Sequence, residues 1–240
     1  MGDLDPELVG LHKAWVRSGG GEGRRLVLHG ADLRHTNLTG TDLSGADLTE
    51  ADMFGAQLDE AGLQETVLRG ANLAGASLSG PGMLEVDLTG ANLTGANLNK
   101  AELIGARLVG AVLRGAQCVR TDFSQADLTG ADLGRAFLVR TYLIDTVLDS
   151  VDLTETDVRL IVGGKRIDVS RVSGMMGVIG CEADTATVTG DGPERMVSVA
   201  ALAEILNRRG ARVSTWAEGE RPPDVPWRWR PHYASFQVGA

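Results

Sequence analysis

The chain carries a five-residue repeat that runs from residue 31 to residue 158 without an insertion or a deletion. Every fifth position of this stretch, 26 in all, is apolar; leucine fills most of them, and the others hold Met53, Met83, Cys118, Phe123 and Val158. The residue two places earlier is Ala or Thr, except at Pro81, Val86 and Val151. A period of five matches neither the 3.6 residues of a helical turn nor the two-residue alternation of a strand.

This period predicts a coil with four sides, in which each quintet forms one side and then turns a corner. The large apolar residue points inward, the small residue packs beside it, and the other three face water. Glycine at the last quintet position, as in Gly40, Gly45 and Gly55, suits a tight corner. Four quintets make a coil of 20 residues, and coils stacked at about 4.8 Å give a rod about 31 Å long. We therefore expect an all-β solenoid over residues 26–160.

The quintets ADLSG, ANLTG and ADLTG follow the pattern A-(D/N)-L-x-G. This pattern resembles the pentapeptide-repeat family over residues 31–158, and the resemblance implies a right-handed quadrilateral β-helix. Within that family, the repeat is similar to that of the quinolone-resistance and topoisomerase-protecting pentapeptide proteins. The resemblance implies a rod that is like DNA in size and charge, dimerises through its C-terminal end and binds DNA gyrase or topoisomerase IV.

Residues 1–25 are predicted to form an N-terminal capping helix followed by a glycine-rich linker. Leu8, Leu11 and Trp15 stand at helical spacing within residues 6–17, and the sequence SGGGEG ends the helix. A solenoid exposes its terminal coils, which need covers to remain monomeric. We expect this helix to cover the first coil.

Residues 161–240 are predicted to form a C-terminal cap or extension of α/β character with a helix over residues 198–209. Ser198 can cap the start of this helix and Gly210 can end it. One apolar stripe of the helix comprises Val199, Leu202, Ile205 and Leu206. Two interpretations stay open, because the stripe can pack on the last coil or form a homodimer.

The last residues are rich in proline and aromatic side chains, among them Trp227, Trp229 and Tyr233. Proline-rich segments stay extended. This tail either lies along the rod or serves as a docking peptide for a partner.

The composition favours binding over catalysis. The sequence has no G-x-S-x-G, HExxH or CxxC motif, and its two cysteines, Cys118 and Cys181, form no metal-ligand spacing. We predict no catalytic residues, no metal and no cofactor. A net charge of −9 disfavours direct nucleic-acid binding, which needs clustered basic residues. Without a long apolar run or a signal peptide, we expect a cytoplasmic protein that does not contact a membrane.

The regular period assigns each quintet to one of four faces, and the charge differs between the faces. The face that begins at residue 41 holds six acidic side chains and no basic one. These acids are Asp42, Glu65, Glu85, Glu102, Asp122 and Asp145. Electrostatic complementarity would direct such a face toward a basic partner surface.

Two functions remain open at this stage, and both are non-catalytic macromolecule binding. The first is a DNA-mimicking binder of a type II topoisomerase, either DNA gyrase or topoisomerase IV, that protects the enzyme from inhibitors or modulates it. The second is a general protein-interaction scaffold with an unknown partner.

Overall fold

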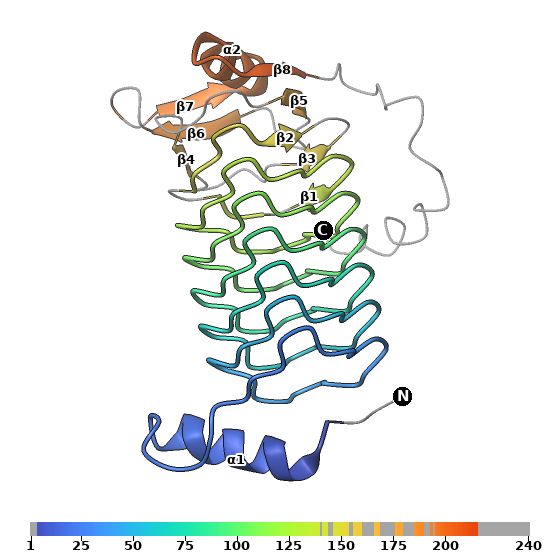
Figure 1. Cartoon of the computed structure of the whole chain (residues 1–240). Helices are drawn as coiled ribbons and strands as arrows, with labels where there is room; N and C mark the ends of the chain where they lie inside the picture. The colour runs from blue at the N-terminus through green and yellow to red at the C-terminus, as the bar shows by residue number, and fades with distance from the viewer. Residues whose placement is uncertain are drawn as a thin grey trace, which may run out of the picture.

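The computed structural model is a rod of stacked coils with a helix across each end (Figure 1). It describes residues 4–139, 141–143, 146–153, 156–159, 166–168, 176–179, 185–189, 193 and 195–215. Helix α1 (Pro6–Arg17) lies across the N-terminal end of the rod, and helix α2 (Val199–Arg208) lies at the C-terminal end. The repeat therefore forms the body of the molecule.

Backbone hydrogen bonds join each coil to the next at the same quintet position. The second residue of a quintet forms a parallel bridge with the residue 20 places further on, as in Asp42↔Gly62 and Gly82↔Glu102. A spacing of 20 residues with five residues per side gives four sides per coil. Each bridge uses two bonds; that of Asp42 with Gly62 uses Leu43 N to Gly62 O at 2.8 Å and Gly62 N to Thr41 O at 3.0 Å. This confirms the predicted register.

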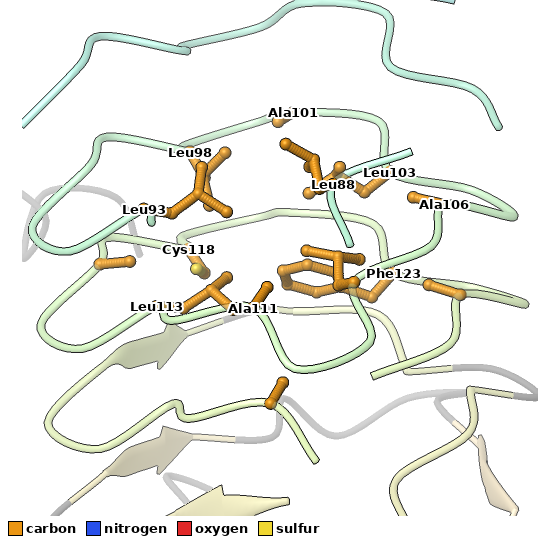
Figure 2. Packing of buried hydrophobic residues seen from close by; sticks show 14 of the residues in the cluster. Leu88, Leu93, Leu98, Ala101, Leu103, Ala106, Ala111, Leu113, Cys118 and Phe123 are labelled. Atoms are coloured by element: carbon orange, nitrogen blue, oxygen red, sulfur yellow. The ribbon is translucent and has the colours of Figure 1, made fainter. Parts of the chain in front are cut away.

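The inward residues form one continuous apolar core along the axis (Figure 2). Leucines of the central coils, such as Leu88, Leu93 and Leu103, are fully buried, as are the smaller residues two places earlier. Each fully buried leucine contributes about 1.5–3 kcal/mol relative to an exposed one. The leucine ladder is therefore the main source of stability in the rod.

The corners explain the glycine at the end of many quintets. Ala46 N donates to Leu43 O at 2.9 Å, and Gly45 between them has φ 68°. A β-turn with positive φ only at its third residue is a type II turn, which favours glycine there. Several corners nevertheless hold glutamate at φ 54–57°, a conformation that disfavours side chains. These glutamates are Glu50, Glu60, Glu65 and Glu85.

A local bond explains the Asp or Asn at the second quintet position. Its side-chain oxygen accepts a hydrogen bond from the N–H of the fourth residue, as Asp42 Oδ1 does from Ser44 N at 3.1 Å. The same bond occurs at Asn37, Asp87 and Asp122. Such a side chain mimics a backbone turn. Asp and Asn at this position therefore have a structural role whatever the rod binds.

Buried threonines at the small position make a second kind of internal bond. Thr66 is fully buried, and its hydroxyl donates to the Leu43 carbonyl at 2.9 Å. The next coil holds Val86, also fully buried, at the equivalent position, so the site accepts a β-branched side chain without a hydroxyl.

We expect Thr66→Val to lower the free energy of unfolding by about 0.5–1.5 kcal/mol, the usual net value of one hydrogen bond. Equilibrium denaturation with urea measures this loss. Val86→Thr is the matched control, since it adds a hydroxyl in the next coil and should change stability less. An unchanged stability for Thr66→Val would show that the buried hydroxyl contributes nothing.

Helix α1 lies across the first coil (Figure 1), and a histidine provides its buried contact. Asp5 caps its start by accepting from Glu7 N at 2.8 Å. Leu8 and Leu11, which stand at helical spacing with Trp15, are each 38% exposed, whereas His12 is fully buried. The imidazole bonds the Leu26 N–H and so orients the helix. The helix lies across this end of the rod with His12, rather than the two leucines, at the buried contact.

Eight short strands follow within the last part of the described chain. They are β1 (Phe137–Val139), β2 (Asp152–Leu153), β3 (Asp157–Arg159), β4 (Arg166–Asp168), β5 (Met176–Ile179), β6 (Thr185–Thr189), β7 (Arg195–Ser198) and β8 (Arg212–Thr215). Parallel pairing continues along β2–β5–β8, whereas β7 pairs antiparallel with β6. The C-terminal end therefore contains an antiparallel strand pair beside parallel ones.

Candidate partner-binding face

The face that begins at residue 41, here called the acidic face, is described for five complete quintets, 41–45, 61–65, 81–85, 101–105 and 121–125. Its acids occupy two columns that run parallel to the rod axis. Asp42, Glu102 and Asp122 stand at the second quintet position, where the bridges form. Glu65 and Glu85 stand at the corners in consecutive coils. The structure therefore brings five of the six predicted acids onto one side.

Asp145, the sixth predicted acid, lies outside the described residues.

The three glutamates of this face have no structural partner among the described residues. Asp42 and Asp122 each accept the N–H bond of their own quintet, from Ser44 and Ser124. Glu65, Glu85 and Glu102 form no such bond and no ion pair within the described chain. The five described quintets also contain no Lys, Arg or His. Arg25 of the linker reaches the Gly45 carbonyl of this face at 2.6 Å, but it forms no ion pair with these acids. The acids of the face are therefore not paired with a cation within the described chain.

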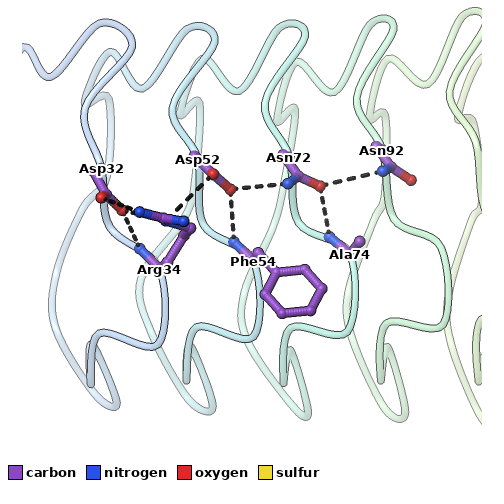
Figure 3. Close-up of polar contacts among 7 residues, drawn as sticks. All are labelled: Asp32, Arg34, Asp52, Phe54, Asn72, Ala74 and Asn92. Atoms are coloured by element: carbon purple, nitrogen blue, oxygen red, sulfur yellow. Dashed lines mark hydrogen bonds and ion pairs between the residues drawn. The ribbon is translucent and has the colours of Figure 1, made fainter. Parts of the chain in front are cut away.

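On the other faces, several acids form ion pairs within the described chain. Figure 3 shows a polar ladder on the face that begins at residue 31, where Arg34 contacts Asp32 at 2.7 Å and Asp52 at 3.6 Å. Asn72 donates to Asp52 at 2.9 Å and accepts from Asn92 at 3.2 Å. The hydrogen bonds from Arg34 hold the pKa of Asp32 well below its usual range.

The face that begins at residue 46 is paired in a similar way. His29 contacts Asp47 at 2.9 Å, and Arg69 contacts Asp87 at 3.9 Å. Burial alone would raise the pKa of Asp47, but hydrogen bonds from Thr49 and His29 together lower it. The acids named on these two faces each contact a basic side chain, whereas no acid of the acidic face forms an ion pair within the described chain.

Two apolar side chains lie at the centre of the acidic face. Leu84 is 37% exposed and Ile104, in the next coil, is half-buried. Both stand at the fourth quintet position, and Glu85 N donates to the Ile104 carbonyl at 3.0 Å. An apolar centre within a charged rim is the usual composition of a protein-binding surface.

The described residues offer little for chemistry. Cys118 is fully buried, and burial raises the pKa of its thiol to about 12, so it is not ionised at neutral pH. No group of three or more His, Cys, Asp or Glu side chains in the described chain could hold a metal ion. Neither helix in that part of the chain is long and apolar enough to cross a membrane. Cys181 lies outside it.

The predicted apolar stripe of α2 faces the chain itself. Leu202 and Leu206 are almost completely buried, and Ile205 is 8% exposed. Ser198 caps the helix by accepting from Ala201 N at 3.1 Å. These three side chains therefore leave no free apolar stripe for a dimer. The side chain of Val199 and the tail residues Trp227, Trp229 and Tyr233 lie outside what is described.

The five-residue period predicts which acids share a face, but it does not show which of them form ion pairs. Ion pairing depends on contacts between residues about 20 positions apart, such as Arg114 with Asp132 at 2.9 Å. His12 was not identified from the sequence, because this residue lies outside the repeat. The one feature that could have indicated its buried position is that it is a polar residue within the predicted capping helix.

The family model for pentapeptide repeats, described as eight copies, matches residues 27–61, 51–80, 91–130 and 121–159, which is just over half of the chain. The chain therefore belongs to the pentapeptide-repeat family. The fold agrees with this assignment, because the matched residues form the stacked coils.

Solved structures of the same family are similar to this chain. HetL, a pentapeptide repeat protein involved in heterocyst differentiation regulation in the cyanobacterium Nostoc sp. strain PCC 7120, is 27% identical; the match covers 70% of this chain and 85% of HetL, with a TM-score of 0.32. Full-length QnrB1, a plasmid-mediated fluoroquinolone resistance protein, is 10% identical, with coverage of 89% and 98% and a TM-score of 0.34. A pentapeptide repeat protein of the Arabidopsis thaliana thylakoid lumen is 31% identical, with coverage of 50% and 77% and a TM-score of 0.24.

No curated protein matches this chain significantly. The TM-scores of these structural matches lie between 0.24 and 0.34.

Proposed function

We propose that this protein is a non-catalytic rod that binds a basic protein surface through the acidic face. The observation that carries this proposal is the lack of ion pairs: five described acids share one face whose own quintets contain no basic side chain, and none of them forms an ion pair within the described chain. Such a field attracts a cationic partner and orients it during encounter.

The spacing of the acids supports a more specific proposal, that the face mimics one strand of DNA. Asp42 and Asp122 are four coils apart, which is about 19 Å along the axis at about 4.8 Å per coil. One DNA strand carries a phosphate every 3.4 Å or so along its axis, hence about six over this length. The face presents five carboxylates over the same distance.

The partner that fits this surface is the DNA-binding region of a type II topoisomerase, DNA gyrase or topoisomerase IV. The repeat resembles the topoisomerase-protecting members of the family, and a DNA-binding region supplies the complementary positive charge. Binding there would protect the enzyme from inhibitors or modulate it. We further infer a right-handed coil, as the family resemblance implies, with an α/β C-terminal extension.

The glutamates at the corners permit a matched test. We expect Glu65→Gln with Glu85→Gln to raise the concentration that half-inhibits gyrase supercoiling by about tenfold or more, because both charges would face the enzyme. Glu50→Gln with Glu60→Gln is the control. These two glutamates also occupy corners at φ 57°, and their removal changes net charge equally, but they lie on other faces.

An equal effect of the two pairs would overturn the DNA-mimic proposal. So would a native protein that neither inhibits gyrase nor displaces duplex DNA from it. The alternative function, a scaffold that docks through the tail, rests on residues outside the described chain and stays a prediction, as does a homodimer through the C-terminal region.

A further inference from the structure

His12 lies in an unusual environment between α1 and the first coil. It is fully buried, and its Nδ1 accepts a hydrogen bond from the Leu26 N–H at 3.1 Å. Its Nε2 is also buried and has no hydrogen-bond partner within the described chain. The imidazole stacks on Trp15 with ring centroids 5.7 Å apart. A buried polar atom without a partner weakens the contact that contains it.

The acceptor role of Nδ1 fixes the protonation state of this ring. An imidazole nitrogen that accepts carries no hydrogen, so the single proton is on Nε2. A second proton on Nδ1 would point at the Leu26 N–H, remove the hydrogen bond and leave a buried cation. The charged groups that face the ring are Arg25, which opposes protonation, and Asp42, which favours it together with the Leu43 carbonyl. Burial is the largest influence, and it lowers the pKa of His12.

Few other polar contacts among the described residues join α1 and its linker to the rod. Arg24 N donates to the Leu11 carbonyl at 3.0 Å, which joins the linker to the helix, and Arg25 Nε donates to the Gly45 carbonyl at 2.6 Å, which joins the linker to the rod. Trp15 lies over Gly45, where an added Cβ would be 3.0 Å from the indole ring. The bond to His12 is therefore a substantial part of the polar contact between the helix and the first coil.

The helix covers an edge that is able to pair with other strands. In later coils, the second residue of each quintet uses its N–H and carbonyl to bond the preceding coil, as Gly62 does with Thr41 and Leu43. The first coil has no preceding coil, so the same groups of Val27, Asp32, Asn37 and Asp42 face the N-terminal end. An open edge of this kind promotes association with other chains.

We propose that α1 is a proton-sensitive cap, which protonation of His12 releases to open the edge of the first coil. The ordinary pKa of histidine is about 6.5. Because the folded state lowers the pKa of His12, the stabilising contribution is complete above about pH 6.5. It is lost as the pH falls below that value toward the lower pKa of the folded state.

Hydrogen exchange of the full chain, followed by mass spectrometry at pH 7.5 and pH 5.5 and corrected for intrinsic rates, tests the cap. We expect opening of residues 26–45 to increase at pH 5.5 by up to about tenfold, the limit set by one pH unit below the ordinary histidine pKa. Residues 86–105 should show no change, because their coils lie within the rod.

His12→Asn keeps an acceptor near the position of Nδ1 and cannot titrate, so its exchange over residues 26–45 should not depend on pH in this range. His29→Asn is the control, since this exposed histidine pairs with Asp47 on a side of the rod, and the native pH response should persist. Exchange of the native chain that is independent of pH, or an equal response in His12→Asn, would overturn the proposal.

A second measurement does not depend on the variant. The ring protons of His12, observed by NMR in the native chain, should titrate below pH 6.5 together with the opening of residues 26–45. A midpoint at or above the ordinary histidine value would contradict the cap.

Discussion

Leu103→Lys should destabilise the rod by at least about 3 kcal/mol and abolish its single cooperative melting transition. Leu103 is fully buried in the middle of the stack, between the coils that contain Met83 and Phe123. Truncation of a buried leucine alone costs about 2–5 kcal/mol, and an unpaired ammonium in the same space adds a large desolvation penalty. Because each coil contacts only its neighbours, one disrupted coil separates the two halves. Thermal melting followed by circular dichroism measures the loss.

The adjacent residue provides the control for that variant. Ile104 points out of the rod and is half-buried, so Ile104→Lys introduces the same charge one residue further along without entering the core. We expect its melting temperature to remain within a few degrees of the native value. A Leu103→Lys variant that melts like the native chain would show that the inward ladder does not hold the coils together.

The sequence predicts the body of the rod because the five-residue period fixes everything local to a quintet. Leu93 is inward, Ala91 packs beside it and Gly95 turns the corner, and all three positions follow from the spacing alone. The parallel bridge of Asn92 to Asn72 follows in turn, since four sides of five residues require it. No tertiary information beyond the repeat is needed for these features.

The ends of the rod are less predictable because they do not repeat. Leu8 and Leu11 have the spacing of a packed stripe, yet the helix is positioned by contacts with the linker and the first coil. The bond between His12 and Leu26 joins residues 14 positions apart, and no pattern in the sequence marks it. Pattern arguments therefore weaken where a segment must fit one particular surface.

The acidic face is an intermediate case. Its acids could be listed from the sequence, because face membership follows from counting. Whether an acid is neutralised depends on which long side chain reaches it from the adjacent coil, as Arg34 reaches Asp52 and Arg69 reaches Asp87. The difference between acids that form ion pairs and acids that do not, which supports the proposed function, therefore depends on the side-chain positions in the structure.

The second large effect on stability is expected for the core layer that contains Phe123. Phe123 and Cys118 point inward from adjacent sides of one coil, and both are fully buried (Figure 2). Phenylalanine is larger than the leucine found at most inward positions and cysteine is smaller, so the two sizes offset each other within one layer. We expect Phe123→Ala to lower the free energy of unfolding by about 3–5 kcal/mol, through lost burial and a residual cavity.

Cys118→Leu tests whether the two side chains compensate for each other in size. We expect this substitution to lower the free energy of unfolding in the native chain and to raise it in the Phe123→Ala variant. In the native chain the added methyl groups overpack the layer and should cost about 1–3 kcal/mol. In the Phe123→Ala background the same leucine enters the space that the ring left, and we expect it to restore part of the stability. Urea denaturation of the four proteins gives the coupling between the two sites, for which contacting residues show about 0.5–3 kcal/mol. If the two substitutions were additive, the layer would not be packed as one unit, and each side of the coil would contribute to stability independently.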